Sequence, residues 1–301
     1  MSLIVASILV LMFLNLVLGS VSIPLKSVWN IICGLGDEPV TWQNIVWKSR
    51  LPQALTALVA GAGLAISGLQ MQTVFRNPLA GPSVLGISSG ASMGVAFVVL
   101  LSGNLGGVAL SKLGFMGEIA LSVVAVTLKK KQKVKGNVTL LIIGVMIGYV
   151  ANAVIGVLKF FSVEEDIRAY VIWGLGSFSR VSGNQMMLFV AIMAILIPLS
   201  FLLIKTLNLM LLGDGYARNL GLNIKRARLL VITSAGVLTA IVTAYCGPVI
   251  FLGLAVPHLC RAIFQTSDHR VLMPAVLFAG AALALVCNLI ARMPGFEGAL
   301  P

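Results

Sequence analysis

The residues of this sequence that could perform chemistry are few and scattered. Asp and Glu number 9, His 2 and Cys 4 among 301 residues. The cysteines have no close-paired spacing, and three lie in or beside apolar segments, where Cys behaves as a small hydrophobic side chain. The four cysteines are Cys33, Cys246, Cys260 and Cys287. We therefore expect neither a metal site nor a disulfide.

A serine nucleophile is the enzymatic arrangement that the residue types allow. A Ser of the segment GISSGAS, residues 86–92, could attack a substrate if His258 lay within hydrogen-bond reach as its base. His258 stands beside Pro257 and close to Arg261, which is more typical of a structural histidine at an interface. An intramembrane hydrolase is therefore an alternative interpretation rather than the main one.

The sequence also lacks the usual devices for ATP use and ion coupling. No glycine-rich loop ending in Gly-Lys-Ser or Gly-Lys-Thr occurs, so any ATP and Mg²⁺ must be bound by a partner, and we expect no cofactor in this chain. An ion-coupled secondary transporter would need acidic residues within its apolar segments, and Glu118 is the candidate. That transporter class is the second alternative.

The composition is that of an integral membrane protein. Hydrophobic residues make up 59% and charged residues 10%, which is outside the usual range of water-soluble domains. Continuous apolar runs of about 18 to 20 residues predict helices, because a backbone in lipid must satisfy its own hydrogen bonds. We predict an all-α polytopic membrane protein with a single transmembrane domain over residues 1–301. The nine predicted spans are 2–19, 51–73, 84–102, 114–128, 138–160, 185–205, 227–246, 248–264 and 272–291.

Charged residues orient these spans. With a cytoplasmic N-terminus, the loops after the second, fourth, sixth and eighth spans are cytoplasmic, and they hold most of the 21 Lys and Arg. The loop after the fourth span contains the run KKKQKVK at 129–135, which we interpret as a topology anchor. Most of the 9 Asp and Glu fall on the other side. The net charge of +12 therefore reflects the positive-inside rule, and we expect no nucleic-acid partner.

A polar cluster, SGLQMQTVFRNPLAGPSVLG at 67–86, interrupts the apolar sequence after the second span. If that span runs inward, Arg76 lies at its cytoplasmic end and avoids a cost of roughly 2.5 to 3.5 kcal/mol at the membrane centre. Pro78 and Pro82 end the helix. Irregular backbone at membrane depth is tolerated where protein buries it or where it borders a water-filled cavity. We therefore interpret this segment, which includes Gln72, as a loop bordering a conduit.

Small residues mark two helix faces. They recur every four residues, at Gly86, Gly90 and Gly94 and again at Gly144, Gly148, Asn152 and Gly156. Such repeats let helix backbones approach closely in lipid, where no hydrophobic force joins helices. Asn152 interrupts the second series near mid-span, and an amide in hydrocarbon needs partners. It either supports packing or lines a pathway.

The cytoplasmic loop 206–226 contains a capped helical segment. Asp214 is a good N-cap, GYARNL gives about one and a half turns, and Gly221 can adopt the left-handed conformation that ends a helix. Asn223 then caps the next helix. A short helix of this kind, flanked by basic residues, is expected either to bind a soluble partner or to act as a structured connector.

Four segments together resemble a known family, the permease subunits of bacterial ATP-binding-cassette importers for iron-siderophores, haem and cobalamin. They are RLPQALTALVAGAGLAISGLQMQTVFRNPLAGPSVLGISSGAS (50–92), LGDGYARNLGLN (212–223), GPVIFLGLAVPHLCRAIFQTSDHRVLMP (247–274) and NLIAR (288–292). Each segment alone is weak, but their order along nearly the whole chain is specific. The resemblance implies the type II importer transmembrane domain with ten helices, so a tenth is expected after residue 301.

The resemblance also implies the setting and the cargo. Such permeases are multi-pass proteins of the bacterial cytoplasmic (inner) membrane, surrounded by membrane lipids, and they are not enzymes. Each pairs with a second copy of itself and binds two cytoplasmic ATP-binding subunits and one periplasmic or lipid-anchored substrate-binding protein. The implied cargo is a bulky metal chelate, with an iron-siderophore first and haem or cobalamin next. A pathway with few charges suits a metal that is already wrapped.

Site residues follow from the same resemblance, position by position. Transport pathway and gate residues are Gln72, Asn77, Pro78, Leu79, Gly136, Asn137, Thr139, Gly148 and Asn152. The helix that couples to the ATPase corresponds to Asp214, Ala217, Arg218, Leu220 and Gly221. Docking of the binding protein corresponds to Arg50 and Arg292. Gln53 stands where the family often has Arg, which leaves Lys48 as a substitute and puts the number of docking charges in doubt.

Overall fold

The computed structural model describes residues 2–35, 38–81, 87–102, 137–181 and 183–292. Every regular element in these ranges is helical, which confirms the predicted all-α fold for the part of the chain described. The α-helices are α1 (Ser2–Val17), α2 (Leu25–Cys33), α3 (Val40–Ile45), α4 (Leu51–Phe75), α5 (Ile87–Ser102), α7 (Asn137–Phe161), α8 (Glu164–Gly174), α9 (Gly183–Phe201), α10 (Ile204–Leu211), α11 (Asp214–Asn219), α12 (Ile224–Cys246), α13 (Leu252–Phe264) and α14 (His269–Ala291). A π-helical turn, Val46–Arg50, makes α3 and α4 continuous, and a 3-10 turn, Phe178–Arg180, precedes α9.

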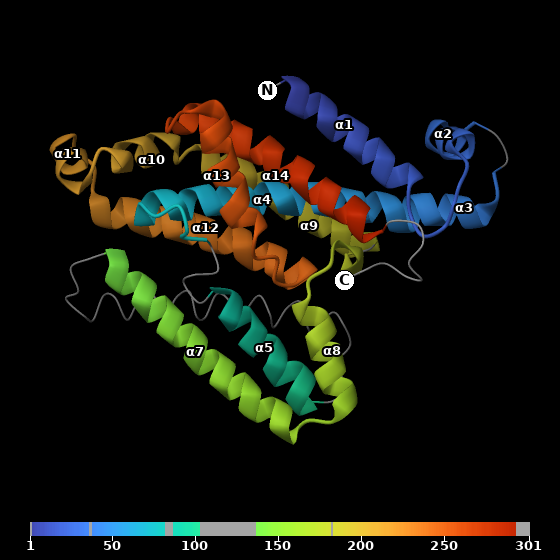
Figure 1. Cartoon of the computed structure of the whole chain (residues 1–301), viewed down its shortest axis with the longest axis horizontal. Helices are drawn as coiled ribbons and strands as arrows, with labels where there is room; N and C mark the ends of the chain where they lie inside the picture. Colours follow the sequence, from blue (N-terminus) through green and yellow to red (C-terminus); the bar gives the residue numbers. More distant parts are fainter. Residues whose placement is uncertain (1, 36–37, 82–86, 103–136, 182, 293–301) are drawn as a thin grey trace.

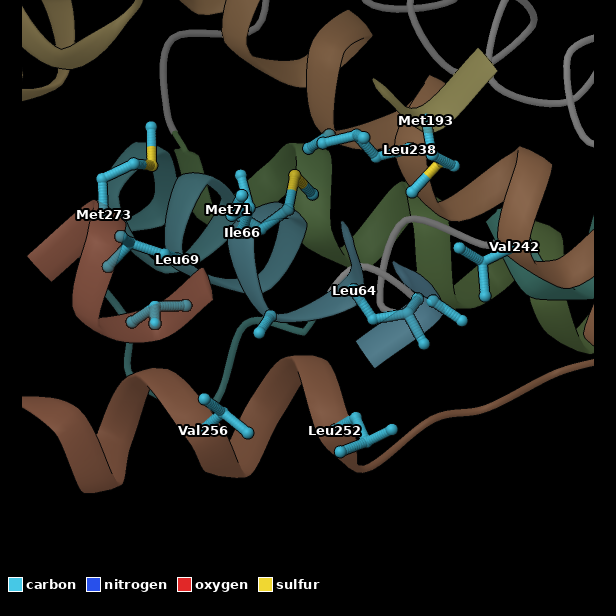
Figure 2. Close-up of a cluster of buried hydrophobic side chains, with 14 of the residues drawn as sticks. Leu64, Ile66, Leu69, Met71, Met193, Leu238, Val242, Leu252, Val256 and Met273 are labelled. Carbon is cyan, nitrogen blue, oxygen red and sulfur yellow. The ribbon is translucent and has the colours of Figure 1, made fainter. Parts of the chain in front are cut away.

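Helix α4 forms the centre of the main bundle (Figure 1). It packs against α14, α12, α13 and α9, and most of its residues are buried. Figure 2 shows buried side chains from these helices in one cluster; those labelled are Leu64, Ile66, Leu69 and Met71 of α4, Met193 of α9, Leu238 and Val242 of α12, Leu252 and Val256 of α13, and Met273 of α14. A helix that is enclosed on all sides is apolar all round, which explains why the sequence of α4 has no polar stripe.

Glycine residues let two of these neighbours approach α4 closely. A Cβ atom on Gly61 would overlap the carbonyl oxygen of Gly280 in α14, and one on Gly68 would overlap the carbonyl oxygen of Gly253 in α13. Backbone therefore touches backbone at both crossings, which is the kind of packing that joins helices in lipid. The two four-residue glycine series of the sequence include neither crossing.

Helices α5, α7 and α8 form a second group beside the main bundle (Figure 1). Within it, Gly148 of α7 faces α5, because a Cβ atom there would lie 3.2 Å from Ser89 Oγ. Gly144 and Gly148 are buried, whereas Asn152 and Gly156 are exposed. A four-residue repeat advances by about 40° at each step around an α-helix. The series from Gly144 to Gly156 therefore does not form one packing face.

Helix α4 ends at Phe75, ahead of the prolines that follow it. Arg76 adopts the left-handed conformation, with φ of 50°. Its N–H donates to the Thr73 carbonyl at 3.3 Å, and the Asn77 N–H donates to the Gln72 carbonyl at 3.2 Å. A non-glycine residue in this conformation costs about 1 to 2 kcal/mol. The two main-chain hydrogen bonds and the contacts of the Arg76 side chain therefore act together to offset that cost.

Several helices are long and apolar enough to cross a membrane. Four continuous segments meet that description, namely Val40–Phe75, Gly144–Phe161, Ile224–Cys246 and His269–Ala291. The pair α9 and α10, bent by 45°, forms a fifth if it is one span. Helices α1 and α13 are apolar but shorter. The predicted span 114–128, with Glu118, lies outside the described residues, so the predicted number of nine spans is not confirmed.

Candidate functional site

Segments that are distant in sequence meet at one end of the main bundle, which we call the Asp214 end. It comprises the turn 76–81 after α4, helices α10 and α11, and the turn 265–268 between α13 and α14. Figure 1 shows α10 and α11 together at this end, whereas α2 and α3 lie at the opposite one. The polar interruption at Arg76 and the capped loop predicted at Asp214 therefore share one end of the molecule.

An acidic side chain joins these segments. Asp214 Oδ1 accepts a hydrogen bond from Arg76 Nη2 at 2.9 Å, and Asp214 Oδ2 accepts one from Arg228 Nη2 at 3.0 Å. Arg76 Nη2 also donates to the Met210 carbonyl at 3.2 Å. We call Arg76, Asp214 and Arg228 the carboxylate clamp. The clamp fixes the start of α11 to the C-terminal end of α4 and to the beginning of α12.

The clamp changes the predicted role of Asp214. The N-cap of α11 is Gly213, with φ of 101°, and Asp214 is the first helical residue, so the prediction that Asp214 caps the helix is wrong. The Asp214 carboxylate instead accepts hydrogen bonds from two guanidinium groups. Gly221 adopts the predicted left-handed conformation, with φ of 85°. Asn223 caps α12 as predicted, because its Oδ1 accepts from the Arg226 N–H at 3.2 Å.

Helix α11 has one buried side and one open side. Ala217 is fully buried, and its carbonyl accepts a hydrogen bond from the Leu222 N–H at 2.9 Å. Arg218 and Leu220 are exposed, and the Tyr216 side chain, between two predicted site residues, is 74% exposed. No sequence pattern marks Tyr216 as a site residue. The open side of α11 thus presents an aromatic ring, an apolar side chain and a cation.

The predicted gate residues after α4 form an ordered turn. Asn77 Oδ1 accepts from the Leu79 N–H at 2.9 Å, and the Asn77 carbonyl accepts from the Ala80 N–H at 3.1 Å. Ala80 is buried, whereas Pro78 and Leu79 are exposed. The side chain of Asn77 thereby holds Leu79 out from the bundle. The gate role of these residues remains a prediction.

A cleft of about 360 Å³ opens beside this turn. Its walls come from the ends of α4, α10 and α13 and from the start of α14; the lining residues are Gln72, Thr73, Arg76, Asn77, Pro78, Leu211, Arg261, Ser267 and His269. Gln72 is buried in one wall, where its Nε2 donates to the Leu254 carbonyl at 3.1 Å and its Oε1 accepts from Arg261 Nη1. Gln72 therefore ties α4 to α13.

A chain of polar side chains ties α4 to α10 and α14 behind the same cleft. Asp268 Oδ1 accepts from Asn208 Nδ2 at 2.6 Å, so Asn208 Oδ1 faces His269 Nδ1, at 2.7 Å. An amide oxygen only accepts, so Nδ1 carries the proton. His269 Nε2 lies 2.8 Å from Thr73 Oγ1, and the same hydroxyl group lies 2.8 Å from the Leu69 carbonyl. Hydrogen bonds from the Arg270 N–H and from Asn208 lower the pKa of Asp268.

Little in the residue pattern indicates this chain of polar side chains. His269 follows an Asp at a helix start, a pattern that indicates a cap but not a buried histidine. The partner of His269 in α10 is Asn208, and it lies far away in the sequence. The bend between α9 and α10 places it against α14. Together with Gln72 and the carboxylate clamp, the chain makes the Asp214 end the most extensively cross-linked polar region among the described residues.

Other predicted pathway residues lie on α7 or outside the description. Asn152 is exposed and Gly148 is buried against α5. Gly136 lies outside the described residues, and Asn137 and Thr139 belong to the first turn of α7 with side chains that are not described. Within the described ranges, no group of three or more His, Cys, Asp or Glu could hold a metal ion.

The predicted docking residues lie at the opposite end of the bundle, which we call the Arg50 end. Arg50 is only 1% exposed, and its Nη1 donates to the carbonyls of Leu16 at 2.8 Å and Val17 at 2.7 Å. Its Nη2 donates to the Val21 carbonyl. The guanidinium group therefore lies beneath the connection between α1 and α2. This burial was not expected for a docking residue.

Arg292 lies beside Arg50, and Lys48 does not. A Cβ atom on Gly19 would lie 3.0 Å from Arg292 Nη2 and 3.1 Å from Arg50 Nη2, so both guanidinium groups converge beneath that glycine. Arg292 is buried and donates to the Asn15 carbonyl at 3.5 Å. The ion pairs of the described residues all involve Asp214, so neither cation has a carboxylate partner there. Lys48 is exposed.

Comparisons with known proteins agree on one family. The model of the FecCD transport family matches residues 7–301. The vitamin B12 import system permease protein BtuC of Klebsiella pneumoniae is 37% identical over 260 residues, covering 86% of this chain and 77% of that protein. BtuC of Salmonella paratyphi A is 36% identical over 257 residues, covering 85% of this chain and 78% of that protein.

Solved structures show the same fold. An inward-facing conformation of a metal-chelate type ABC transporter superposes with a TM-score of 0.84 at 26% identity, covering 96% of this chain and 89% of that one. The structure of PsaBC from Streptococcus pneumoniae in complex with Fab has a TM-score of 0.52 at 17% identity, covering 88% of this chain and 85% of that one, and it supports the fold alone.

Proposed function

The chain belongs to the FecCD transport family, and from that premise we propose that it is the permease through which an ABC importer takes up a bulky metal chelate. The observation that carries the mechanism is the carboxylate clamp, because it joins the predicted gate turn at Arg76 to the predicted coupling helix at Asp214. In this proposal residues 1–301 form one transmembrane domain, and the chain performs no chemistry of its own.

The Asp214 end is proposed to face the cytoplasm and the partner ATPase subunits. Tyr216 and Leu220 stand out from α11, and exposed aromatic and apolar side chains are typical of surfaces that bind a protein. Arg218 adds a positive charge beside them. We propose that the loop 206–226 transmits movement of two ATPase subunits to the permease. The N-terminus of α1 points away from the Arg50 end, as a cytoplasmic N-terminus requires.

The pathway is proposed to lie against the open face of α7 and the gate turn. Asn152 is exposed on that face, beside Tyr149, which lies three residues earlier on the helix. A second copy of the chain would complete a conduit there, with Leu79 and the residues around Gly136 as gates. An alternating-access cycle then requires that the loaded binding protein and ATP each favour a different state, because equal affinity for both shifts no population.

The Arg50 end is proposed to receive the external substrate-binding protein. Arg50 and Arg292 are two close cations without a described carboxylate partner, and burial of unpaired charge is costly. Carboxylates of the binding protein would compensate them. The main-chain carbonyls of residues 16–21 now hold Arg50, so docking must displace or share those bonds. Lys48, which is exposed, can attract the partner without any rearrangement.

The cargo is proposed to be a metal chelate rather than a bare ion. The relatives named above are vitamin B12 permeases, and the solved structure with the higher TM-score is a metal-chelate transporter. Cobalamin is therefore the first cargo to test, with iron-siderophores and haem as the other members of the same class.

The test is uptake by the natural full-length protein, assembled with its ATPase and binding protein in sealed vesicles. We expect ATP-dependent accumulation of radiolabelled cyanocobalamin, or of an iron-siderophore or haem in parallel assays, and retention of the ATPase through purification. Uptake that continues without ATP, or that follows an imposed proton or sodium gradient, would refute the importer proposal in favour of a secondary transporter.

A further inference from the structure

Arg261 is a half-buried cation in the last turn of α13 that no described carboxylate neutralises. Its Nη1 donates to Gln72 Oε1, which is a neutral partner. The ion pairs in the described ranges both use Asp214, which binds Arg76 and Arg228 instead. A guanidinium group carries five N–H donors. Most of the donors of Arg261 therefore remain for a ligand in the cleft.

The cleft around Arg261 presents donors and no acid. Arg76 lies in its lining, and Asn77 and Ser267 add an amide and a hydroxyl group. None of the lining residues is Asp or Glu. Two guanidinium groups with neutral donors beside them are the arrangement that binds an oxyanion, because each guanidinium can donate two parallel N–H bonds to it.

We propose that this cleft binds a phosphate group, with Arg261 as the main cationic contact and Arg76 as the second. A neutral or cationic ligand would leave Arg261 uncompensated in a partly buried position. A phosphate would also share Arg76 with Asp214, so its binding would alter the carboxylate clamp. The proposal concerns ligand binding alone and does not depend on which cargo, if any, the protein transports.

Two sources can supply this chemistry, the headgroup of an anionic phospholipid and free inorganic phosphate. The surroundings favour the lipid. Leu211 gives the cleft an apolar rim and is 40% exposed. A phospholipid can place its phosphate at Arg261 and lay its acyl chains along this apolar rim, at the end of a helix that is itself apolar.

The experiment uses the natural full-length transporter, purified with its partner subunits in detergent. Native mass spectrometry measures retained phosphatidylglycerol against phosphatidylcholine, and equilibrium dialysis measures binding of labelled inorganic phosphate. We expect selective retention of phosphatidylglycerol, reduced at least fivefold by Arg261→Gln and largely kept by Arg261→Lys. Inorganic phosphate that binds without any lipid retention would support the site and identify the soluble ion as its source.

Two further variants keep the test decisive. Ser267→Glu places a carboxylate at an exposed position of the cleft and should also abolish binding, without removing the bond that Arg261 makes to Gln72. Arg270→Gln removes an exposed cation at the same end that does not line the cleft, and it should change nothing. The proposal is overturned if neither ligand binds, as when a carboxylate of a partner subunit fills the cleft. It is also overturned if binding survives both Arg261→Gln and Ser267→Glu, or falls equally in Arg270→Gln.

Discussion

Arg76 and Asp214 form an ion pair at 2.9 Å although 138 positions separate them in the sequence. Arg76 ends α4 in a left-handed conformation, and Asp214 begins α11. Their side chains are 44% and 45% exposed, so solvent and salt screen the pair, and such a pair is worth about 1 kcal/mol or less. Its importance is therefore positional: it determines where the predicted coupling helix lies relative to the predicted gate turn.

The first prediction concerns the coupling of ATP hydrolysis to transport. Asp214→Asn removes the charge that both arginines share, while an amide of the same size remains. We expect a loss of stability of about 1 kcal/mol or less, and at least a threefold drop in cargo molecules transported per ATP hydrolysed. Uptake and phosphate release, measured in the same reconstituted vesicles, give that ratio. Arg270→Gln removes an exposed cation at the same end of the bundle that makes no described ion pair, and it serves as the control.

Two substitutions of Arg76 separate the effect of its side chain from the effect of its backbone conformation. Arg76→Gly removes the ion pair but suits the left-handed φ, whereas Arg76→Ala removes the pair and retains the strain of about 1 to 2 kcal/mol. We expect both variants to uncouple transport equally and Arg76→Gly to have the higher unfolding midpoint of the two, because the glycine relieves the backbone strain. Equal stability of the two variants would show that the backbone at Arg76 relaxes when the side chain is lost.

The second prediction concerns the glycine crossings of α4. Gly68→Ala would drive a methyl group into the carbonyl oxygen of Gly253, so α13 must move away. Overpacking of this kind costs about 3 kcal/mol, measured as the free energy of unfolding in mixed micelles. Gly156→Ala in α7 is the control, because nothing lies within 4 Å of its added Cβ, and replacing a helical Gly by Ala gains up to about 1 kcal/mol.

The sequence allowed some of this arrangement to be predicted and not the rest, for physical reasons. Hydrophobic runs and charge asymmetry are local in sequence, and they were enough to predict helices and to put Arg76 and Asp214 on one side. The contact between Gly68 and Gly253 depends on which helices are neighbours, and the residue spacing within α4 does not indicate its neighbours. The helix start at Asp214 was predicted within a residue, but its carboxylate bonds to two distant arginines that local capping rules cannot foresee.

The third prediction separates the two kinds of docking charge at the Arg50 end. Arg50→Gln leaves the buried Leu16 carbonyl without this donor, at about 1 to 3 kcal/mol for an unsatisfied group, and removes the bonds to the part-buried carbonyls of Val17 and Val21. It should therefore destabilise the protein as well as weaken docking. Lys48 is exposed, and Lys48→Gln should leave stability within about 0.5 kcal/mol. Its effect on the association rate of the binding protein should be largest at low salt. A loss of rate that is independent of salt would remove Lys48 from the docking surface.

The last prediction concerns acid and the start of α14. Asp268 is the N-cap of α14: its Oδ1 accepts from the Arg270 N–H at 2.9 Å and from Asn208 Nδ2 at 2.6 Å. These bonds favour the carboxylate form and lower its pKa from the ordinary value of 3.8. A lowered pKa in the folded state means that the stabilisation is complete above the pKa of the unfolded state and is lost as the pH falls through the pKa of the folded state.

The unfolding midpoint of Asp268→Ala should therefore lie below that of the unaltered protein at neutral pH, and the gap should narrow only below the ordinary pKa. Thermal unfolding of both proteins in detergent at a series of pH values measures that gap, and Asp166→Ala, in the first turn of α8, provides a control at an acid that makes no described ion pair. A gap that is constant down to the most acidic pH would mean that the amide of Asn208, rather than the charge on Asp268, holds α14 against α10.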